Sequence, residues 1–395
     1  MKTTMSKALS LVLVVILLGT MMVGCSGSGT KENSNDANSA VPTEKPADSS
    51  TTTAPEQSSK ELDKVTLVFP RSYECLDDAH IHAAIEMGYF EENGIEVVFE
   101  QAYGTDDLSM IVAGQADVGY PSSFVQIAGH ESELPFKSIY QVDNCNIFGF
   151  SVKEDSGINS IADLKGKTIA LGDPAWNTIS DPILIAAGIS PDEVTYITAG
   201  ESRAQMVDAG QADAVLTWYK EFELWNGQGI TLKYLAGEDV LKITGGCLTF
   251  ANEFIEDPAN KDLLERFVKA YAMGSYFTYL NPVAATEITM NKFPSLNVDF
   301  QWALLSIEHL IYIDNGEDVE KNGYGWHNEE KWNAQMEACR NGGTLTRTDL
   351  TVDEIYTNDF VAAANDFDHA RVEQDAKDYK VSDEHQSFVY FNEPR

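Results

Sequence analysis

The sequence predicts an α/β fold that is built from two consecutive lobes. Short apolar runs typical of buried strands alternate with segments that have the composition of helices. The order strand, helix, strand, helix, strand occurs twice, and each copy contains the pentapeptide Ala-Gly-Gln-Ala-Asp, at 113–117 and at 209–213. This alternation indicates parallel strands that are joined by crossover helices.

The first copy begins at an apolar run that Pro70 terminates, as expected for a strand, because proline cannot donate to a sheet. The expected elements are, in chain order, a strand over 65–69, a helix over 78–88, a strand over 95–99, a helix over 106–112 and a strand over 118–120.

The second copy repeats this plan. The expected elements are a strand over 167–171, a helix over 180–187, a strand over 194–198, a short helix over 202–207 and a strand over 214–216. In both copies we interpret the pentapeptide as a helix end with a left-handed glycine, followed directly by a strand. A further helix over 258–280 carries aromatic residues at core spacing.

Parallel sheets bind their ligands outside the carboxyl ends of the strands, where the loops gather. A binding site is therefore expected to draw on loops of both lobes. These loops are 70–78, 100–105 and 120–124 in the first lobe, and 172–178, 198–202 and 217–220 in the second.

The composition excludes some classes of protein. The chain has 27 Lys and Arg against 62 Asp and Glu, a net charge of −35, so its surface repels nucleic acid. Five cysteines in 395 residues are too few for a disulfide scaffold. The 43% hydrophobic content is sufficient for a large core, and the length suggests about two domains.

The amino-terminal segment 1–24 is interpreted as a signal peptide. Its apolar run, 8–18, follows two lysines and is shorter than the roughly 20 residues that a spanning helix needs. Small residues around Cys25 resemble a bacterial lipoprotein processing site, which implies a lipidated Cys25 on the outer face of the cell membrane. The alternative is an ordinary signal peptide with an incidental cysteine. Residues 25–60 contain few apolar types and are expected to form a disordered tether.

Several segments resemble solute-binding proteins of ABC importers. They are Met87–Val97, which contains Gly-Tyr-Phe, then Ala113–Gly119 and Ile161–Ile169. Near the end, Gly325-Trp326, Trp332, Asn341-Gly342 and Tyr356–Phe360 are similar to the NMT1/THI5-like branch, which binds thiamine-pyrimidine precursors, riboflavin, nitrate and sulfonates. The resemblance covers about 65–365.

The resemblance implies a type II periplasmic-binding-protein fold. Lobe 1 would be 61–145 plus 252–395, and lobe 2 would be 146–251 with two hinge strands, near 146–150 and 248–250. Such a protein closes on a small-molecule ligand and presents it to a membrane permease with its ATPase. We expect a monomer that touches the membrane only through its lipid anchor, has no cofactor and is not an enzyme.

Two other functions remain open. A surface sensor would bind the same ligand but signal through a partner. A pyrimidine synthase shares the fold and resembles this branch, but its cysteine-rich iron motif is absent here.

Candidate binding residues of the first lobe follow its strands. Arg71 could pair a ligand carboxylate or phosphate, and the alternative is a solvated turn charge. Ser122 and Ser123 open a helix and form either an anion or carbonyl site or a plain cap. The other candidates are Tyr73, Asp78, His80 and Tyr103. Asp78, which otherwise caps a helix, stands where the thiamine-precursor branch has a histidine, and His80 follows two residues later. We expect no metal site.

Candidates of the second lobe are aromatic and polar. They are Asp173, Trp176, Asn177, Trp218 and Tyr219. We expect Trp176 or Trp218 to stack on the ligand, whereas the alternative is core packing. The predicted ligand is a neutral or weakly charged aromatic or heteroaromatic nutrient, such as a vitamin or a pyrimidine. A small sulfonate or nitrate is the alternative.

Two cysteines fall just before the hinge crossings. Cys145 and Cys247 are hypothesised to form a disulfide or a close thiol pair. Cys75 lies in a loop of the site without a neighbouring base in sequence to activate it.

Overall fold

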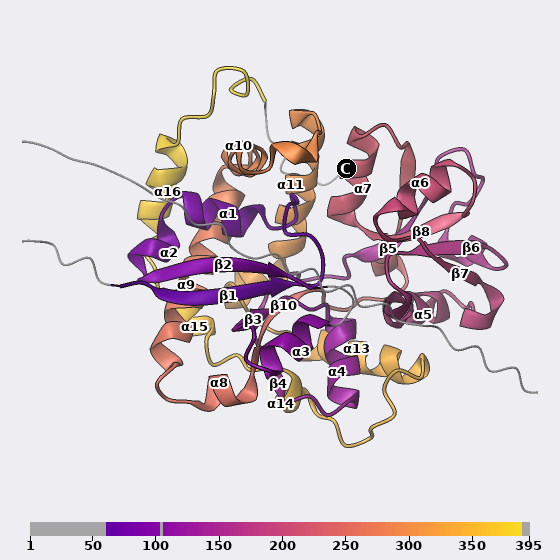
Figure 1. The fold of residues 1–395 in the computed structure, drawn as a ribbon, viewed down its shortest axis with the longest axis horizontal. Coiled ribbons are helices and arrows are strands. Elements are labelled where there is room, and N and C mark those ends of the chain that lie inside the picture. Colours follow the sequence, from indigo (N-terminus) through magenta and orange to yellow (C-terminus); the bar gives the residue numbers. More distant parts are fainter. Residues whose placement is uncertain (1–60, 103–105, 389–395) are drawn as a thin grey trace, which may run out of the picture. The chain divides into compact units, whose positions relative to one another are not determined.

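The computed structural model describes residues 61–102 and 106–388. These residues form two mixed sheets (Figure 1). In spatial order, the first sheet contains β2 (Ile95–Gln101), β1 (Asp63–Phe69), β3 (Val118–Gly119), β10 (Cys247–Ala251) and β4 (Phe136–Gln141). The second contains β7 (Thr195–Thr198), β6 (Thr168–Leu171), β8 (Ala214–Trp218), β5 (Phe148–Lys153) and β9 (Leu232–Ala236).

The predicted strands pair as expected. β1 is parallel to β2 and β3, and β6 is parallel to β7 and β8. Each sheet is extended by antiparallel strands, β10 and β4 in the first and β5 and β9 in the second. β4 and β9, which the sequence did not predict, make each sheet wider than the expected three-stranded unit.

Helices surround both sheets. In the view of Figure 1, α1 and α10 lie above the first sheet, and α3, α4 and α8 lie below it. The helices are α1 (Ala79–Glu86), α2 (Tyr89–Glu92), α3 (Asp106–Val112), α4 (Ser123–Glu131), α5 (Asn177–Ala186), α6 (Arg203–Asp208), α7 (Tyr219–Gly227), α8 (Asn252–Glu256), α9 (Lys261–Leu280), α10 (Pro282–Lys292), α11 (Phe300–Asp314), α12 (Glu317–Asn322), α13 (Glu329–Asn341), α14 (Val352–Ile355), α15 (Val361–Ala364) and α16 (His369–Asp378).

The repeated pentapeptide has the same role in both sheets. Gly114 and Gly210 have φ values of 67° and 70°, the left-handed conformation that glycine adopts without strain. The aspartates that end the repeats, Asp117 and Asp213, accept hydrogen bonds from the backbone N–H of Thr66 in β1 and Thr168 in β6, at 2.7 and 2.9 Å. The repeat therefore turns the chain and fastens the new strand to the first strand of its own sheet.

The chain passes between the sheets twice, through the crossing segments 142–147 and 237–246. The two segments are bonded to each other: the backbone N–H groups of Val142 and Asp143 both donate to Gly246 O at 3.1 Å. The sequence predicts two adjacent hinge strands near 146–150 and 248–250. In the structure the adjacent crossing segments are 142–147 and 237–246, and the predicted strands lie in the two sheets as β5 and β10. The carboxy-terminal third then packs on both sheets, because Trp332 and Met336 of α13 share a core with Phe150 of β5 and Leu216 of β8.

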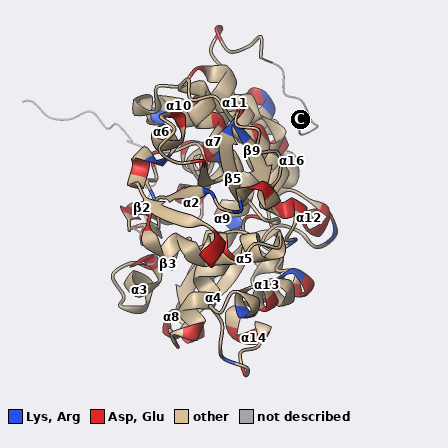
Figure 2. Ribbon diagram, turned by 90° about the vertical axis from the view of Figure 1, so that its right-hand side faces the viewer, with Lys and Arg blue, Asp and Glu red and all other residues tan. Residues whose placement is uncertain are grey.

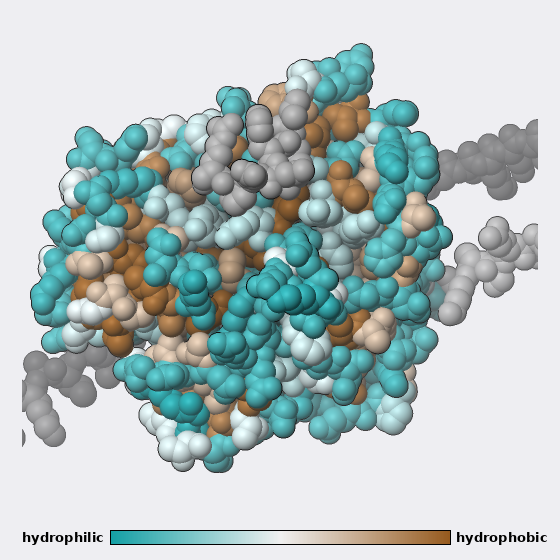
Figure 3. All heavy atoms as spheres, turned by 180° about the vertical axis from the view of Figure 1, so that it is seen from behind, coloured by the Kyte–Doolittle hydropathy of each residue, from teal (hydrophilic) through white to brown (hydrophobic). Residues whose placement is uncertain are grey.

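Charged residues are spread over the described chain. Acidic residues are distributed over many elements of the ribbon in Figure 2, and α12 and α13 carry residues of both signs. Apolar residues reach the face shown in Figure 3 in several patches between polar ones. Within 61–102 and 106–388, no helix is both long and apolar enough for a bilayer span. The predicted signal peptide, Cys25 and the tether lie outside the described residues.

Candidate functional site

Two adjoining pockets lie between the sheets. The inner pocket has a volume of about 70 Å³, and the outer pocket about 300 Å³. Residues of both sheets line them, and Arg71, Asp77, Trp176 and Trp218 belong to both linings. The inner pocket's charged and aromatic lining residues are Arg71, Asp77, Tyr120, Asp143, Phe148, Trp176, Trp218 and Lys220.

The fold explains why these residues meet. Arg71 and Tyr120 follow the carboxyl ends of β1 and β3, Trp176 follows β6 through the short turn Pro174–Trp176, and Trp218 ends β8. Because the carboxyl ends of neighbouring parallel strands share one sheet edge, each sheet contributes one wall. The predicted position of the site, at the strand ends of both lobes, agrees with this pocket.

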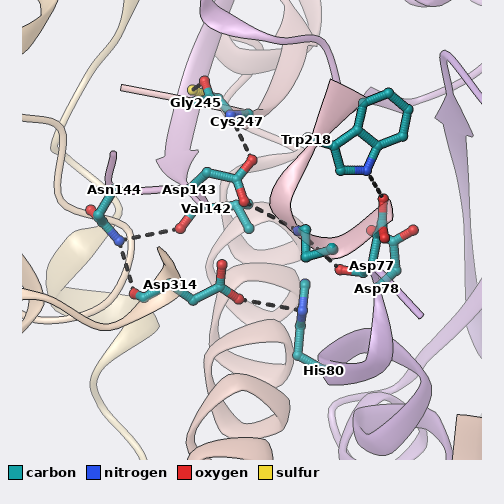
Figure 4. Close-up of polar contacts among 12 residues, drawn as sticks. Asp77, Asp78, His80, Val142, Asp143, Asn144, Trp218, Gly245, Cys247 and Asp314 are labelled. Atoms are coloured by element: carbon teal, nitrogen blue, oxygen red, sulfur yellow. Dashed lines mark hydrogen bonds and ion pairs between the residues drawn. The ribbon is translucent and has the colours of Figure 1, made fainter. Parts of the chain in front are cut away.

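Aromatic rings form the wall from the second sheet. The ring of Trp218 lies edge-on to Trp176, with centroids 6.0 Å apart, and to Phe148, with centroids 6.4 Å apart. The indole Nε1–H of Trp218 donates to Asp77 Oδ2 at 2.6 Å, a contact that joins the two walls (Figure 4). A ligand ring would meet apolar faces here with hydrogen-bonding groups beside them.

The wall from the first sheet is charged. Arg71 donates to both oxygens of Asp78, at 2.7 and 3.0 Å, and its Nε lies 3.5 Å from Asp77 Oδ2. Burial opposes ionisation of Asp78, but the Arg71 guanidinium lowers the pKa of that carboxyl below its usual value. Burial raises the pKa of Asp77, against the opposing charges of Arg71 and Lys220. Arg71 is therefore committed to Asp78 and has little capacity left for a ligand anion.

Lys220 enters the pocket from α7 with its side chain 2% exposed. Its ammonium lies 3.4 Å from Asp143 Oδ1 and donates to Asp77 O at 3.3 Å. The other oxygen of Asp143 accepts from the backbone N–H of Gly246 at 2.8 Å. A Cβ on residue 246 would lie 2.7 Å from that oxygen, so glycine permits this approach. The lysine thus links the second lobe to the crossing segment 142–147 and to the loop after β1.

A second layer of polar groups lies behind the pocket. His80 Nδ1 lies 3.5 Å from Asp314 Oδ2 (Figure 4). His80 Nε2 bonds to the hydroxyl of Tyr271. Burial lowers the pKa of His80 to about 3, so the imidazole is neutral near pH 7. Burial also raises the pKa of Asp314, against the charge of Lys220.

The predicted site residues fall into three groups. Arg71, Ser122, Asp173, Trp176 and Trp218 line one or both pockets. Asp78 and His80 are buried in the polar layer behind. The remaining described candidates, Tyr73, Ser123, Asn177 and Tyr219, line neither pocket, and Tyr103 lies outside the described residues.

Candidates that line neither pocket contact other parts of the structure. Tyr73 stacks on Phe99 with ring centroids 5.6 Å apart, because the loop after β1 bends back over β2. The hydroxyl of Ser123 donates to Thr244 O at 2.8 Å. Tyr219 is the first residue of α7 and stacks on His309 of α11, in a separate groove of about 1030 Å³. Tyr219 and Trp218 are consecutive, and the chain changes from strand to helix between them, so their side chains diverge.

Sequence reasoning missed Asp77, Asp143 and Lys220 as residues of the site. Lys220 was within the expected loop 217–220, so its position was a usable signal. Asp143 lies on a crossing segment rather than at a parallel strand end, and no local pattern marks it. Two cations that were not among the candidates, Lys220 and Arg203, line the inner and outer pockets, respectively.

The proposed disulfide is also wrong. The described cysteines, Cys75, Cys145, Cys247 and Cys339, are free. The Cys247 thiol instead donates to Gln141 Oε1 at 3.4 Å. Burial raises the pKa of Cys75 despite the nearby Arg71, so this thiol is not activated as a nucleophile.

Two sheets, two crossings and a pocket at the strand ends define a type II periplasmic-binding-protein fold, and solved structures share it. The periplasmic aliphatic sulphonate-binding protein SsuA of Escherichia coli matches with a TM-score of 0.59 at 14% identity, over 75% of this chain and 99% of that chain. The chain belongs to the NMT1/THI5-like family, whose model matches residues 77–285.

Curated relatives differ in function. The riboflavin-binding protein RibY of Chloroflexus aurantiacus is 24% identical over 72% of this chain and 82% of its own length. The 4-amino-5-hydroxymethyl-2-methylpyrimidine phosphate synthase of Legionella pneumophila is 26% identical over 61% of this chain and 85% of its own length. The relatives of this chain thus include a protein named as a binding protein and one named as a synthase.

Proposed function

We propose that this chain is an extracytoplasmic solute-binding protein that captures a small aromatic or heteroaromatic nutrient and delivers it to an ABC permease. The observation that carries the proposal is the inner pocket, in which Trp176, Trp218 and Phe148 of one lobe face Tyr120 and Asp77 of the other. Apolar ring faces with a few convergent polar groups are the usual construction of a small-molecule site.

The pocket volumes limit what can enter. The inner pocket of about 70 Å³ is smaller than a typical ligand site of roughly 300–1,000 Å³, so it accepts one ring or a compact head group. The outer pocket of about 300 Å³ then holds the rest of a larger molecule. A nutrient with one ring fits without movement, whereas a fused three-ring system requires the lobes to open.

The binding reading is favoured over a synthase. The described thiols are not activated, and the cysteine-rich motif that the synthase resemblance would require is absent from the sequence. A sulfonate or nitrate is disfavoured because Arg71 is already paired with Asp78 and carboxylates line the inner pocket. The lipid anchor on Cys25 rests on the sequence alone, and the mass of the mature protein tests it: an amino-terminal cysteine without diacylglycerol would rule it out.

A thermal-shift screen tests the binding proposal. We expect riboflavin, thiamine, 4-amino-5-hydroxymethyl-2-methylpyrimidine or a related ring compound to raise the melting temperature, because a ligand that binds only the folded state stabilises it by about 2.7 kcal/mol at 100 times its Kd. Taurine, which carries a sulfonate, and nitrate are the anionic compounds of the screen. Stabilisation by these anions alone would contradict the aromatic ligand, and conversion of a pyrimidine precursor by the purified protein would contradict the binding role.

A further inference from the structure

We propose, on the basis of the proposed function, that the inner pocket selects a ligand whose ring carries a positive charge, as a protonated amine or a cationic ring nitrogen. The charged group would lie against Asp77 and Asp143 while the ring packs between the aromatic side chains. This assignment is narrower than the neutral or weakly charged ligand that the sequence predicts, and it excludes the sulfonate alternative.

The first observation is an excess of carboxylates. Asp77, Asp78, Asp143 and Asp314 form one cluster around the pocket, each 5% exposed or less, and they face the cations Arg71 and Lys220. The cluster therefore contains two more carboxyl groups than cations, and burial raises the pKa of two of these carboxyls, Asp77 and Asp314. His80 does not supply the difference, because burial keeps its imidazole neutral near pH 7.

The second observation concerns the hydrogen-bond partners of the two cations. Both terminal nitrogens of Arg71 bind Asp78. Lys220 contacts the carboxylate of Asp143 but only the backbone carbonyl of Asp77. The carboxylate of Asp77 retains the indole N–H of Trp218 and the Nε of Arg71 at 3.5 Å. Its pKa is raised by burial, as expected for a carboxyl that lacks a full counter-charge.

The third observation is an unused polar group in the lining. The hydroxyl of Tyr120 is buried, its residue is 6% exposed, and it has no hydrogen-bond partner within the described part of the chain. A buried hydroxyl without a partner costs free energy, and Tyr120 belongs to the lining of the inner pocket, so its hydroxyl is available to a polar group of a ligand. An ammonium or a ring N–H could donate to this oxygen and to Asp77.

The aromatic wall suits a cation as well. The guanidinium of Arg203 already lies over Trp176 and Trp218, 5.1 and 5.4 Å from their ring centroids, and is paired with Glu221 in the outer pocket. These indole rings therefore accept a cation on their faces in this protein. An anion in the same place would meet Asp77 and Asp143 in a site with little water, where like charges repel strongly.

Three single-ring probes of different charge test the inference: benzylammonium, benzyl alcohol and benzenesulfonate, measured by isothermal titration at pH 7.5 on the mature protein. We expect benzylammonium to bind at least tenfold more tightly than benzyl alcohol, and benzenesulfonate to show no binding. Equal affinity for the cation and the alcohol, tighter binding of the sulfonate, or no binding of benzylammonium at millimolar concentration would each overturn the inference.

Two substitutions make the test more specific, because they should have opposite effects on the affinity for benzylammonium. Asp77→Asn should lower the affinity for benzylammonium at least tenfold and change the affinity for benzyl alcohol less than twofold, because the substitution removes the charge of the side chain but keeps its shape. Lys220→Met should raise the affinity for benzylammonium, because it removes a cation that competes for the same carboxylates. Glu96→Gln, at an exposed acid on β2, is the control and should change neither.

The outcomes separate the two proposals. If Lys220→Met fails to fold, as judged by circular dichroism, the result with Asp77→Asn decides. An unchanged preference for the cation in Asp77→Asn would overturn the inference. Suppose that a neutral nutrient from the thermal-shift screen binds, and that benzylammonium binds no more tightly than benzyl alcohol. Only the positive charge assigned to the ligand is then contradicted. If no ring compound in that screen binds, the solute-binding proposal itself fails.

Discussion

At the scale of single residues, buried charge dominates the site. Asp78 is 1% exposed and depends on Arg71 for both of its strong hydrogen bonds. Removing one partner of a buried pair leaves an uncompensated charge, which typically costs 3–5 kcal/mol. The pair is therefore a structural support for the loop after β1, which places Asp77 in the pocket.

We predict that Arg71→Met lowers the free energy of unfolding by about 3–5 kcal/mol in urea denaturation at pH 7. The double variant Arg71→Met/Asp78→Leu should recover most of that loss, because both charges are then absent. Lys321→Met, which breaks an exposed pair with Glu317, is the control and should leave the free energy of unfolding almost unchanged, because water screens this pair. A similar loss in the single and double variants would show that the ion pair is not the cause.

At the scale of elements, the sequence predicted more of the fold than of the site. Apolar runs and turn residues predicted the strands of both parallel units, because hydrophobic pattern and the conformational freedom of glycine can be assigned from a short stretch of sequence. β4 and β9 were missed, since antiparallel strands at the sides of these sheets follow no repeat. The site depends on contacts between distant segments, such as Lys220 with Asp143, and no local pattern records that pairing.

Helix α3 contains a second buried acid with a measurable consequence. Asp107 is 0% exposed in the first turn of the helix, and burial raises its pKa to about 7. A carboxyl whose folded pKa lies above its unfolded value stabilises the fold at low pH, and this stability is lost as the pH rises through the folded pKa. The contribution of Asp107 should therefore decrease between about pH 4 and pH 7.

We predict that Asp107→Asn raises the free energy of unfolding at pH 8 by about 4 kcal/mol relative to the wild type. The advantage should shrink towards pH 5, where the native carboxyl is already protonated. Urea unfolding at several pH values measures the difference, and Asp106→Asn, at the exposed neighbouring acid, is the matched control. A constant difference at all pH values would contradict the raised pKa.

At the scale of the whole described chain, the site is shared between two sheets. The walls are joined by Trp218 with Asp77 (Figure 4), and Lys220 of the second lobe contacts Asp143 on a crossing segment. Binding and the relative movement of the lobes are therefore expected to be coupled, because a ligand that enters the inner pocket must contact both walls or separate them. The crossings, which bond to each other at Gly246, lie beside the same pocket.

Titration of tryptophan fluorescence with the ring compound that gives the largest thermal shift tests the central claim most directly. The account predicts quenching in the wild type, with affinity at least tenfold lower in Trp218→Ala and in Trp176→Ala. Trp302→Ala, in the separate groove beside α11, should bind as the wild type does. Unchanged affinity in both pocket variants, or a loss that Trp302→Ala reproduces, would contradict a ligand held between the two sheets.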